Sequence, residues 1–363
     1  MNLYCIALLV LFLGDTKNPL HPQEAEYLGT PILLTSPEQF LKAGEAYFNS
    51  TTTQIIFQAI KKPEPGDVPA EDYSMYVGTL AFDENKQISG LNNIQQISEE
   101  GSANTCGWFH PQKSSTVLFA TTTIPKNEEN MPGYQRESGE YRWAFPPAMN
   151  IVTCDLNNIK QKTPLITNNN HYVAEGSWSP DGRHVLYCSL SSGDGDIFVR
   201  DLQTGKSALL IDSPGYDGGP FFSPDGKRIT YRSDRNQNDL LQIFIADLAF
   251  NEDGAIIGIS KEIQLTNNIH VNWCPFWHPT NQFLIYTTSE IGHQNYELFI
   301  CDTSPNAPAG SIANKIRITH TNGFDGLPVF SADGKILMWT SKRETNSSQL
   351  WAAPFKSSSI NFQ

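Results

Sequence analysis

The sequence predicts an all-β fold, a six-bladed β-propeller built from four-stranded antiparallel blades. Two repeats carry this prediction. One is an aromatic residue followed by a tight turn, and the other is an apolar residue followed by Thr, Ser or Asp, between 10 and 13 positions earlier. The two repeats recur together six times, at roughly the length of one propeller blade. Each pair therefore marks one blade.

The turn repeat is clearest at Trp178, Phe222 and Phe330, each of which is followed by Ser, Pro or Ala, Asp and Gly. Asp-Gly pairs tolerate the positive φ that a tight antiparallel turn requires, so each turn should join the first and second strands of a blade. Three more aromatic residues precede similar β-rich runs. We call the six aromatic residues the anchor residues: Phe48, Phe109, Trp178, Phe222, Trp277 and Phe330.

The second repeat predicts the outer strand of each blade. Its copies are Leu34-Thr35, Ile97-Ser98, Ile166-Thr167, Ile211-Asp212, Leu265-Thr266 and Ile318-Thr319. The first copy precedes the first anchor, and no copy follows the last strand at residues 350–353. The strand from Ile32 to Thr35 is therefore predicted to complete the last blade and close the ring, which removes an unpaired sheet edge. An open solenoid or a β-sandwich is the alternative, but the two repeats match in number only if the chain ends meet.

The repeats occupy nearly the whole chain, so residues 25–363 are predicted to form one propeller domain. Residues 1–24 are interpreted as a signal peptide and short leader, because the apolar run from Tyr4 to Gly14 has the length of a signal-peptide core and is too short to span a bilayer. This predicts a periplasmic or secreted protein with no membrane span.

Composition limits the class of partner. The chain has 38 Asp and Glu against 25 Lys and Arg, a net charge of −13, which argues against nucleic acid. This charge is compatible with a cation, a basic protein surface or a neutral ligand as the partner. Alternatively, the acidic residues only keep the protein soluble. Cys106 and Cys274 occupy equivalent positions in opposite blades, so we expect free, buried thiols.

Loop lengths predict which face of the propeller binds. Four insertions fall between the second and third strands of their blades, at residues 61–73, 121–148, 233–241 and 289–296. The turns of the opposite face stay mostly short. Length variation confined to one face of a rigid scaffold is typical of a binding surface.

A ring of polar groups is predicted where the chain runs into each first strand, at the mouth of the central channel. Its candidate residues are Asn104, Glu175, Asp217, Asn272 and Asp325, with His171, Tyr216, His270 and Phe324 as neighbours. Oxygen ligands of this kind bind a divalent cation, for which Asp217 and Asp325 are the candidates, or hold a peptide end. The alternative is that they cap loops and bind channel water. Arg232 is the one cation at its position in the second strands, so it pairs with Asp217 or with an anionic ligand group.

The longest insertion, residues 121–148, contains Tyr134, Tyr141, Trp143 and Phe145. Aromatic residues in such a loop form a lid or a surface for a protein partner, or they pack against the neighbouring blade. The sequence does not distinguish an exposed role from packing against the neighbouring blade.

No catalytic motif is present. The sequence lacks a Gly-x-Ser-x-Gly elbow, a His-Glu-x-x-His pair, a glycine-rich phosphate loop and a Ser-x-x-Lys pair. We therefore name no catalytic residue and expect no cofactor. Lyase or hydrolase chemistry by single histidines and carboxylates remains an alternative.

The Ser-Pro-Asp-Gly turns resemble the propeller repeats of the TolB family. The resemblance covers roughly residues 160 to 345 and includes third strands such as residues 197–202 and the inter-blade run at residues 204–219. It implies a propeller that holds protein partners at one face, as in the soluble periplasmic protein of the Tol-Pal envelope system. That family also has an N-terminal α/β domain, for which this chain has no room before Leu34. Similar propellers accompany peptidase and lyase domains.

Taken together, the sequence predicts an exported, non-catalytic binding module that engages a protein or peptide partner through its loop-rich face and channel mouth. The competing hypothesis is a propeller enzyme or carbohydrate-binding protein, with a small ligand or saccharide near a metal at the channel mouth.

Overall fold

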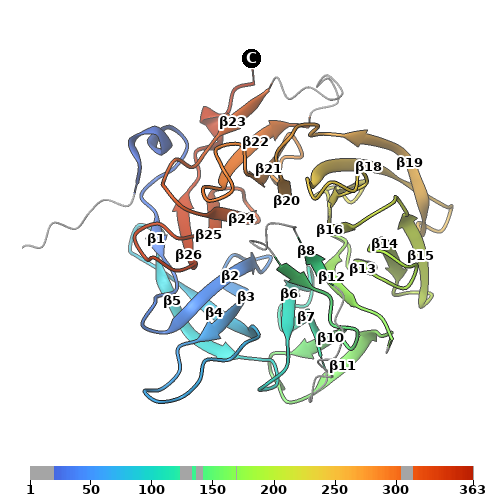
Figure 1. The fold of residues 1–363 in the computed structure, drawn as a ribbon, viewed down its shortest axis with the longest axis horizontal. Coiled ribbons are helices and arrows are strands. Elements are labelled where there is room, and N and C mark those ends of the chain that lie inside the picture. Colours follow the sequence, from blue (N-terminus) through green and yellow to red (C-terminus); the bar gives the residue numbers. More distant parts are fainter. Residues whose placement is uncertain (1–19, 123–132, 136–141, 169, 304–313, 363) are drawn as a thin grey trace, which may run out of the picture.

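The structure is a computed structural model that describes residues 20–122, 133–135, 142–168, 170–303 and 314–362. Over these ranges the chain forms six four-stranded antiparallel sheets, arranged around a central axis, and one two-stranded hairpin (Figure 1). The prediction of a six-bladed propeller is confirmed.

The strands follow the chain from the axis outward in five of the six blades. The first blade holds β2 (Phe40–Phe48), β3 (Gln54–Lys61), β4 (Ser74–Phe82) and β5 (Ile88–Gln96), and the second holds β6 (Asn104–Phe109), β7 (Thr116–Thr121), β10 (Asn150–Asp155) and β11 (Lys162–Ile166). The third holds β12 (Val173–Trp178), β13 (His184–Ser189), β14 (Asp196–Asp201) and β15 (Lys206–Ile211), and the fourth holds β16 (Asp217–Phe222), β17 (Arg228–Ser233), β18 (Gln242–Phe250) and β19 (Ile256–Gln264). The fifth holds β20 (Asn272–Trp277), β21 (Phe283–Thr288), β22 (Glu297–Asp302) and β23 (Lys315–Arg317), and the sixth holds β24 (Asp325–Phe330), β25 (Ile336–Ser341), β26 (Gln349–Pro354) and β1 (Ile32–Leu33). The remaining elements are the hairpin strands β8 (Gly133–Gln135) and β9 (Arg142–Ala144) and the 3₁₀ helices η1 (Pro22–Glu26) and η2 (Ser357–Ser359).

Each anchor residue ends the first strand of its blade, as the repeat predicts. In the Ser-Pro-Asp-Gly turns the Ser hydroxyl donates to the Asp carboxylate, at 2.6 Å between Ser223 and Asp225. The same hydroxyl accepts the backbone N–H of Arg228 at 2.9 Å, which starts the second strand. Gly226 completes the turn with a φ of 69°. The motif thus satisfies backbone donors that a sharp turn would leave unpaired.

Replacing Gly226 by Ala should lower the free energy of unfolding by about 1–2 kcal/mol, because a Cβ is disfavoured at this positive φ. The nearest atom to the new methyl group would be Pro180 Cδ at 3.6 Å, so the loss would come from backbone strain and not from a clash. Gly90→Ala, in open space on β5, is the matched control and should be neutral or slightly stabilising. Urea unfolding measures the free energy of unfolding of both variants. Equal effects would contradict the backbone strain expected at Gly226.

The ring closes through the N-terminal strand. Ile32 and Leu33 pair antiparallel with Ala352 and Trp351. Thr35 follows β1, and its hydroxyl accepts the N–H of Leu350 at 2.9 Å. Its counterpart in the fourth blade, Thr266, accepts the N–H of Ile243 at 2.8 Å. The apolar-Thr repeat therefore marks a hydrogen bond between outer and third strands, and the N-terminal strand supplies it for the last blade.

Ahead of β1, a buried ion pair joins η1 to the last blade. The Arg343 guanidinium donates to both carboxylate oxygens of Glu24, at 3.0 and 3.1 Å, and lies 3.4 Å from Asp325. The side chains of all three are at most 1% exposed. We call this group, Glu24 with Arg343 and Asp325, the N-terminal clasp. Residues 1–19 of the predicted leader lie outside the described residues, whereas Leu20 and Glu24 contact the propeller.

Two further expectations concern the described residues. Of the helices found there, none is long and apolar enough to cross a membrane. The five cysteines described are free and buried, as predicted: Cys106, Cys154, Cys188, Cys274 and Cys301.

A candidate binding cavity in the central channel

The innermost strand of every blade carries a β-bulge three residues before its anchor. The residue at the bulge has a positive φ of 45° to 60° in all six blades. We call these six residues the channel ring: Glu45, Cys106, Glu175, Gly219, Cys274 and Leu327. A bulge inserts one extra residue and reorients the side chain there. All six line a cavity of about 510 Å³ on the propeller axis.

Aromatic side chains close the cavity below the channel ring. They lie one residue before the anchors of four blades: Tyr47, Trp108, Phe221 and Phe276. Their rings contact one another across the axis, with centroids 4.6 Å apart for Tyr47 and Trp108 and 5.6 Å apart for Phe221 and Phe276. We call this group the aromatic floor. The first strand of each blade runs from the face that carries the insertion loops (the loop face) to the face that carries the turns after the anchor residues (the turn face). The aromatic floor, near the ends of these strands, therefore closes the channel on the side of the turn face.

The insertion loops reach the rim of the cavity. Glu71, Asp72 and Tyr73 belong to the insertion between β3 and β4, and Pro146 and Met149 to the one between β7 and β10. The two other predicted insertions, at residues 233–241 and 289–296, connect second and third strands but contribute no lining residue. Two of the four insertions thus form the mouth of a cavity that is closed at the opposite end.

Glu175 and Arg232 form a buried network on one wall. Arg232 Nη2 lies 3.3 Å from Glu175 Oε2 and donates to the Tyr216 hydroxyl at 2.8 Å. The hydroxyls of Tyr216 and Tyr172 donate to Glu175 at 2.7 and 3.1 Å, and the backbone N–H of Gly219 donates to it as well. Burial raises the pKa of Tyr216 and of Tyr172 well above the usual value, so both hydroxyls remain donors. Arg232 therefore pairs with Glu175 of the neighbouring blade, and not with Asp217.

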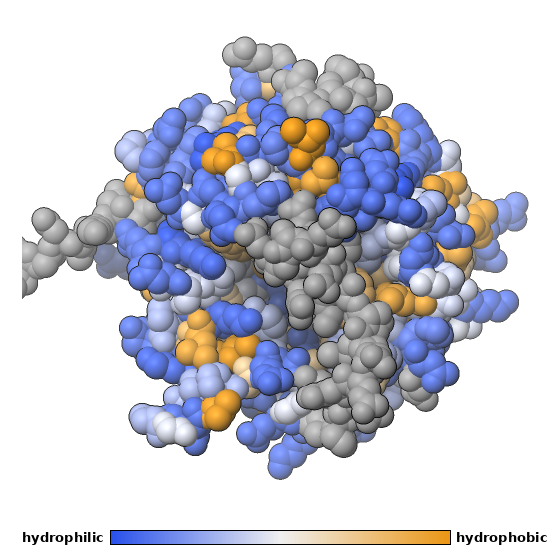
Figure 2. All heavy atoms as spheres, in the orientation of Figure 1, coloured by the Kyte–Doolittle hydropathy of each residue, from blue (hydrophilic) through white to orange (hydrophobic). Residues whose placement is uncertain are grey.

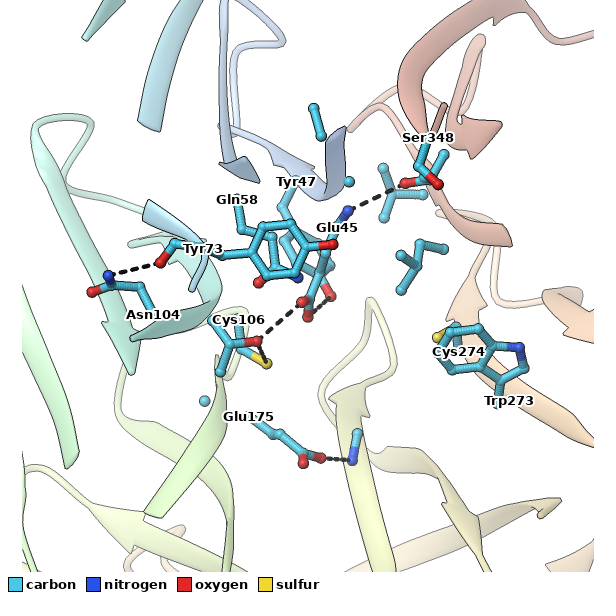
Figure 3. A pocket seen from close by; sticks show the side chains of 18 of the residues that line it. Glu45, Tyr47, Gln58, Tyr73, Asn104, Cys106, Glu175, Trp273, Cys274 and Ser348 are labelled. Carbon is cyan, nitrogen blue, oxygen red and sulfur yellow. Dashed lines mark hydrogen bonds between the residues drawn. The ribbon is translucent and has the colours of Figure 1, made fainter. Parts of the chain in front are cut away.

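Glu45 lies on the other wall. Figure 3 shows its carboxylate between Tyr73 and Cys106. The hydroxyl of Thr105 donates to one oxygen at 3.2 Å, and that of Tyr47 donates to the other at 3.3 Å. Burial raises the pKa of Glu45 above its ordinary value, and it raises the pKa of the Cys106 thiol well above its own. This carboxylate, unlike Glu175, has only neutral donors.

The polar residues predicted five positions before the anchors are buried at the junctions between blades. Asn104 donates to the carbonyl of Tyr73 at 3.0 Å and also lines the cavity. Asn272 donates to Gln242 at 3.1 Å, and Asp325 belongs to the N-terminal clasp. Asp217 accepts the N–H of Ser213 at 3.0 Å, and burial raises its pKa to about 7. The last three are outside the cavity lining.

The aromatic and histidine residues predicted beside the polar ring differ in their position relative to the cavity. Phe324 lines the cavity, Tyr216 lies behind it in the Glu175 network, and neither His171 nor His270 is among the lining residues. Within the described ranges, no group of three or more His, Cys, Asp and Glu side chains is arranged to hold a metal ion. The pair Asp217 and Asp325 lies in separate blades, the fourth and the sixth.

Two of the four aromatic candidates of the longest insertion lie in its hairpin strands. Tyr134 and Trp143 are opposite each other in β8 and β9, and Tyr141 lies outside the described residues. Phe145 is 6% exposed and packs on Tyr172 and Tyr216, with ring centroids 4.9 and 5.5 Å apart. For Phe145 the structure thus shows packing against the neighbouring blade.

The cavity residues that sequence reasoning missed include Glu45, Tyr73 and Trp273. Glu45 had a detectable signal, since it stands three residues before its anchor, as Glu175 does. Tyr73 is the last residue of an insertion, and nothing in its spacing marks it.

The fold and the cavity define a β-propeller with a cavity on its axis that is open at one end. Comparisons with known proteins then identify its type. Residues 147–308 match the family model described as TolB beta propeller domain, so the chain carries a TolB-like propeller. The resemblance inferred from the turns is confirmed.

Relatives match only part of the chain. The Tol-Pal system protein TolB of Francisella tularensis is 36% identical over 77 residues, which are 21% of this chain and 18% of that protein. Dipeptidyl-peptidase 5 of Porphyromonas gingivalis is 37% identical over 89 residues, 21% of this chain and 13% of that protein. The matches thus span less than a fifth of these relatives. The structure of a putative TolB from Agrobacterium tumefaciens has a TM-score of 0.53 at 16% identity and covers 88% of this chain and 92% of its own, which shows a shared fold.

Proposed function

We propose that the protein is an exported, non-catalytic binding module that holds an extended segment of a protein or peptide partner at the loop face of the propeller. The observation that carries this proposal is the cavity of about 510 Å³, open at the insertion loops and closed by the aromatic floor. Such a cavity receives side chains or a chain end from one side only. Its volume is in the range of ligand pockets.

Exposed apolar side chains support a partner at this face. Val68 is 89% exposed in the insertion between β3 and β4, and Ile269 is 80% exposed in the loop that leads into β20. Both loops are on the side of the cavity mouth. The molecular face in Figure 2 is mainly hydrophilic, with apolar side chains in small, separate groups. Binding would therefore concentrate on a few apolar contacts around a recess.

Similarity to TolB supports the class of partner and the compartment. The relatives include a protein of the Tol-Pal system, and we propose the periplasm or the cell exterior as the location of this chain.

Site-specific photo-crosslinking tests the proposal. A benzophenone amino acid at position 348, on the cavity wall, should capture a partner when the protein is expressed in its native cells. The same residue at position 227 is the matched control, because Lys227 is exposed in a turn on the opposite face. Capture at 348 and none at 227 is the expected result. Equal capture at both positions, or none at 348, would contradict a partner at the loop face.

A further inference from the structure

The charges around the cavity are unevenly compensated. Its lining includes four carboxylates, Glu45, Glu71, Asp72 and Glu175, and two cations, Lys42 and Arg232. Arg232 is bound to Glu175, and the Lys42 ammonium lies over the ring of Tyr73, 4.6 Å from its centroid. In the described part of the chain, no lysine, arginine or histidine forms an ion pair with Glu45. Glu45 is the carboxylate deep in the cavity that lacks a counter-ion.

A carboxylate withdrawn from water without a cation is costly, and a ligand that supplies the positive charge recovers part of that cost. The neighbours of Glu45 cannot supply it. Thr105 and Tyr47 offer neutral hydroxyls at 3.2 and 3.3 Å, and Arg232 attracts the carboxylate only from a distance, because Glu175 holds its guanidinium. Cys106 and Cys274 stay neutral, since burial raises the pKa of both thiols.

We infer that the cavity accepts a protonated primary amine, whose ammonium group binds the Glu45 carboxylate while the aromatic lining surrounds the adjoining carbon atoms. This inference rests on the proposed function and deepens it: the partner segment that enters would present an amine, either a lysine side chain or a free N-terminus.

The aromatic lining fits that class of ligand. Tyr73, Trp273 and Phe276 contribute to the walls, and Tyr47 lies at both the carboxylate and the floor. Ring faces attract cations, and Tyr73 already does so with the ammonium of Lys42. At the rim, Glu71 and Asp72 add negative charge on the path by which a cation would approach. The competing arrangement is an anion at Arg232, on the opposite wall.

Three small probes of similar size separate these possibilities: 2-phenylethylamine, 2-phenylethanol and 3-phenylpropionate, used at pH 7. Binding is measured by calorimetry and by the fluorescence of tryptophan, since Trp273 lines the cavity. The amine should bind the wild-type protein at least about tenfold more tightly than the alcohol, as expected for one charge-assisted hydrogen bond in a recessed site. This comparison needs no variant.

Glu45→Gln keeps the shape of the side chain and removes its charge. It should abolish the preference for the amine and leave binding of the alcohol unchanged. Glu38→Gln, an exposed carboxylate ahead of β2, is the matched control and should behave as wild type. Thermal unfolding of each variant confirms that the fold is kept.

Any other result of the probe-binding experiment would overturn the inference. Equal binding of amine and alcohol, an amine preference that survives in Glu45→Gln, or binding of no probe would exclude Glu45 as an ammonium site. Tighter binding of phenylpropionate would assign the cavity to an anion at Arg232. None of these results decides the crosslinking experiment at position 348, so the proposed function stands or fails separately.

Discussion

The double variant Asp217→Asn with Glu297→Gln should gain about 2 kcal/mol of stability relative to the wild-type protein as the pH rises from 6.5 to 8. Both carboxyls are 0% exposed. Burial raises the pKa of Glu297 to about 8, with Asp325 adding repulsion, and burial raises that of Asp217 to about 7. The folded protein thus keeps protons that the unfolded chain has already lost.

The direction follows from that difference in bound protons. A carboxyl with a raised pKa in the folded state stabilises the fold below its unfolded pKa, and this stabilisation is lost as the pH rises through the folded pKa. For Asp217 and Glu297 the loss begins above the ordinary carboxyl pKa and ends only near pH 7 and 8, so its last part falls between pH 6.5 and 8. Amides do not titrate, so the variant escapes the loss.

Urea unfolding at several pH values measures the stability difference between variant and wild type. Buried histidines such as His184 and the buried thiols also titrate, but they are present in both proteins and cancel. Asp155→Asn is the control: Asp155 is exposed and a backbone hydrogen bond from Asn157 lowers its pKa, so its difference from wild type should stay constant over this window. A constant difference for the double variant too would show that Asp217 and Glu297 of the wild-type protein are already ionised at pH 6.5.

Replacing Arg343 by Met should lower the free energy of unfolding by about 3–5 kcal/mol, because it leaves two buried carboxylates without their cation. Arg343 is 2% exposed, and Glu24 and Asp325 are both 0% exposed. The same variant should release η1 from the last blade. Urea unfolding gives the stability, and limited proteolysis should show faster cleavage ahead of β1.

Two comparisons make the Arg343 result specific. Lys335→Met removes a partner from an exposed pair, in which Lys335 Nζ lies 3.7 Å from Asp333, and should change stability by less than about 1 kcal/mol. Glu24→Gln added to Arg343→Met should restore part of the loss, since it removes one of the uncompensated charges. If Arg343→Met cost no more than Lys335→Met, the N-terminal clasp would not contribute to stability.

The sequence predicts the fold well because its repeats have local chemical causes. In the Ser-Pro-Asp-Gly turns the Ser hydroxyl donates to the Asp carboxylate and accepts the backbone N–H that starts the second strand. Thr35 likewise bonds the third strand as Thr266 does in its own blade. Such hydrogen bonds require particular residue types at fixed offsets. Counting those offsets was sufficient to locate all six blades and the closing strand.

The site is less predictable, because it depends on a backbone feature that residue types do not reveal. Counting in simple alternation back from an anchor fails across the β-bulge, which adds one residue. Asp217 and Asn272, five positions before their anchors, consequently lie outside the cavity lining, while Glu45 and Leu327 at the bulge lie inside it. That both a glutamate and a leucine adopt positive φ there shows how weak the sequence signal is.

The pairing of the first strand with the last sheet has a consequence during translation. Ile32 and Leu33 leave the ribosome early, whereas their partners Trp351 and Ala352 lie about 320 positions further along the chain and are made much later. Five blades can form from neighbouring segments, but the sixth must wait until β26 has been made. Because contacts between residues so distant in sequence form slowly, completion of the last sheet should be a late step in folding.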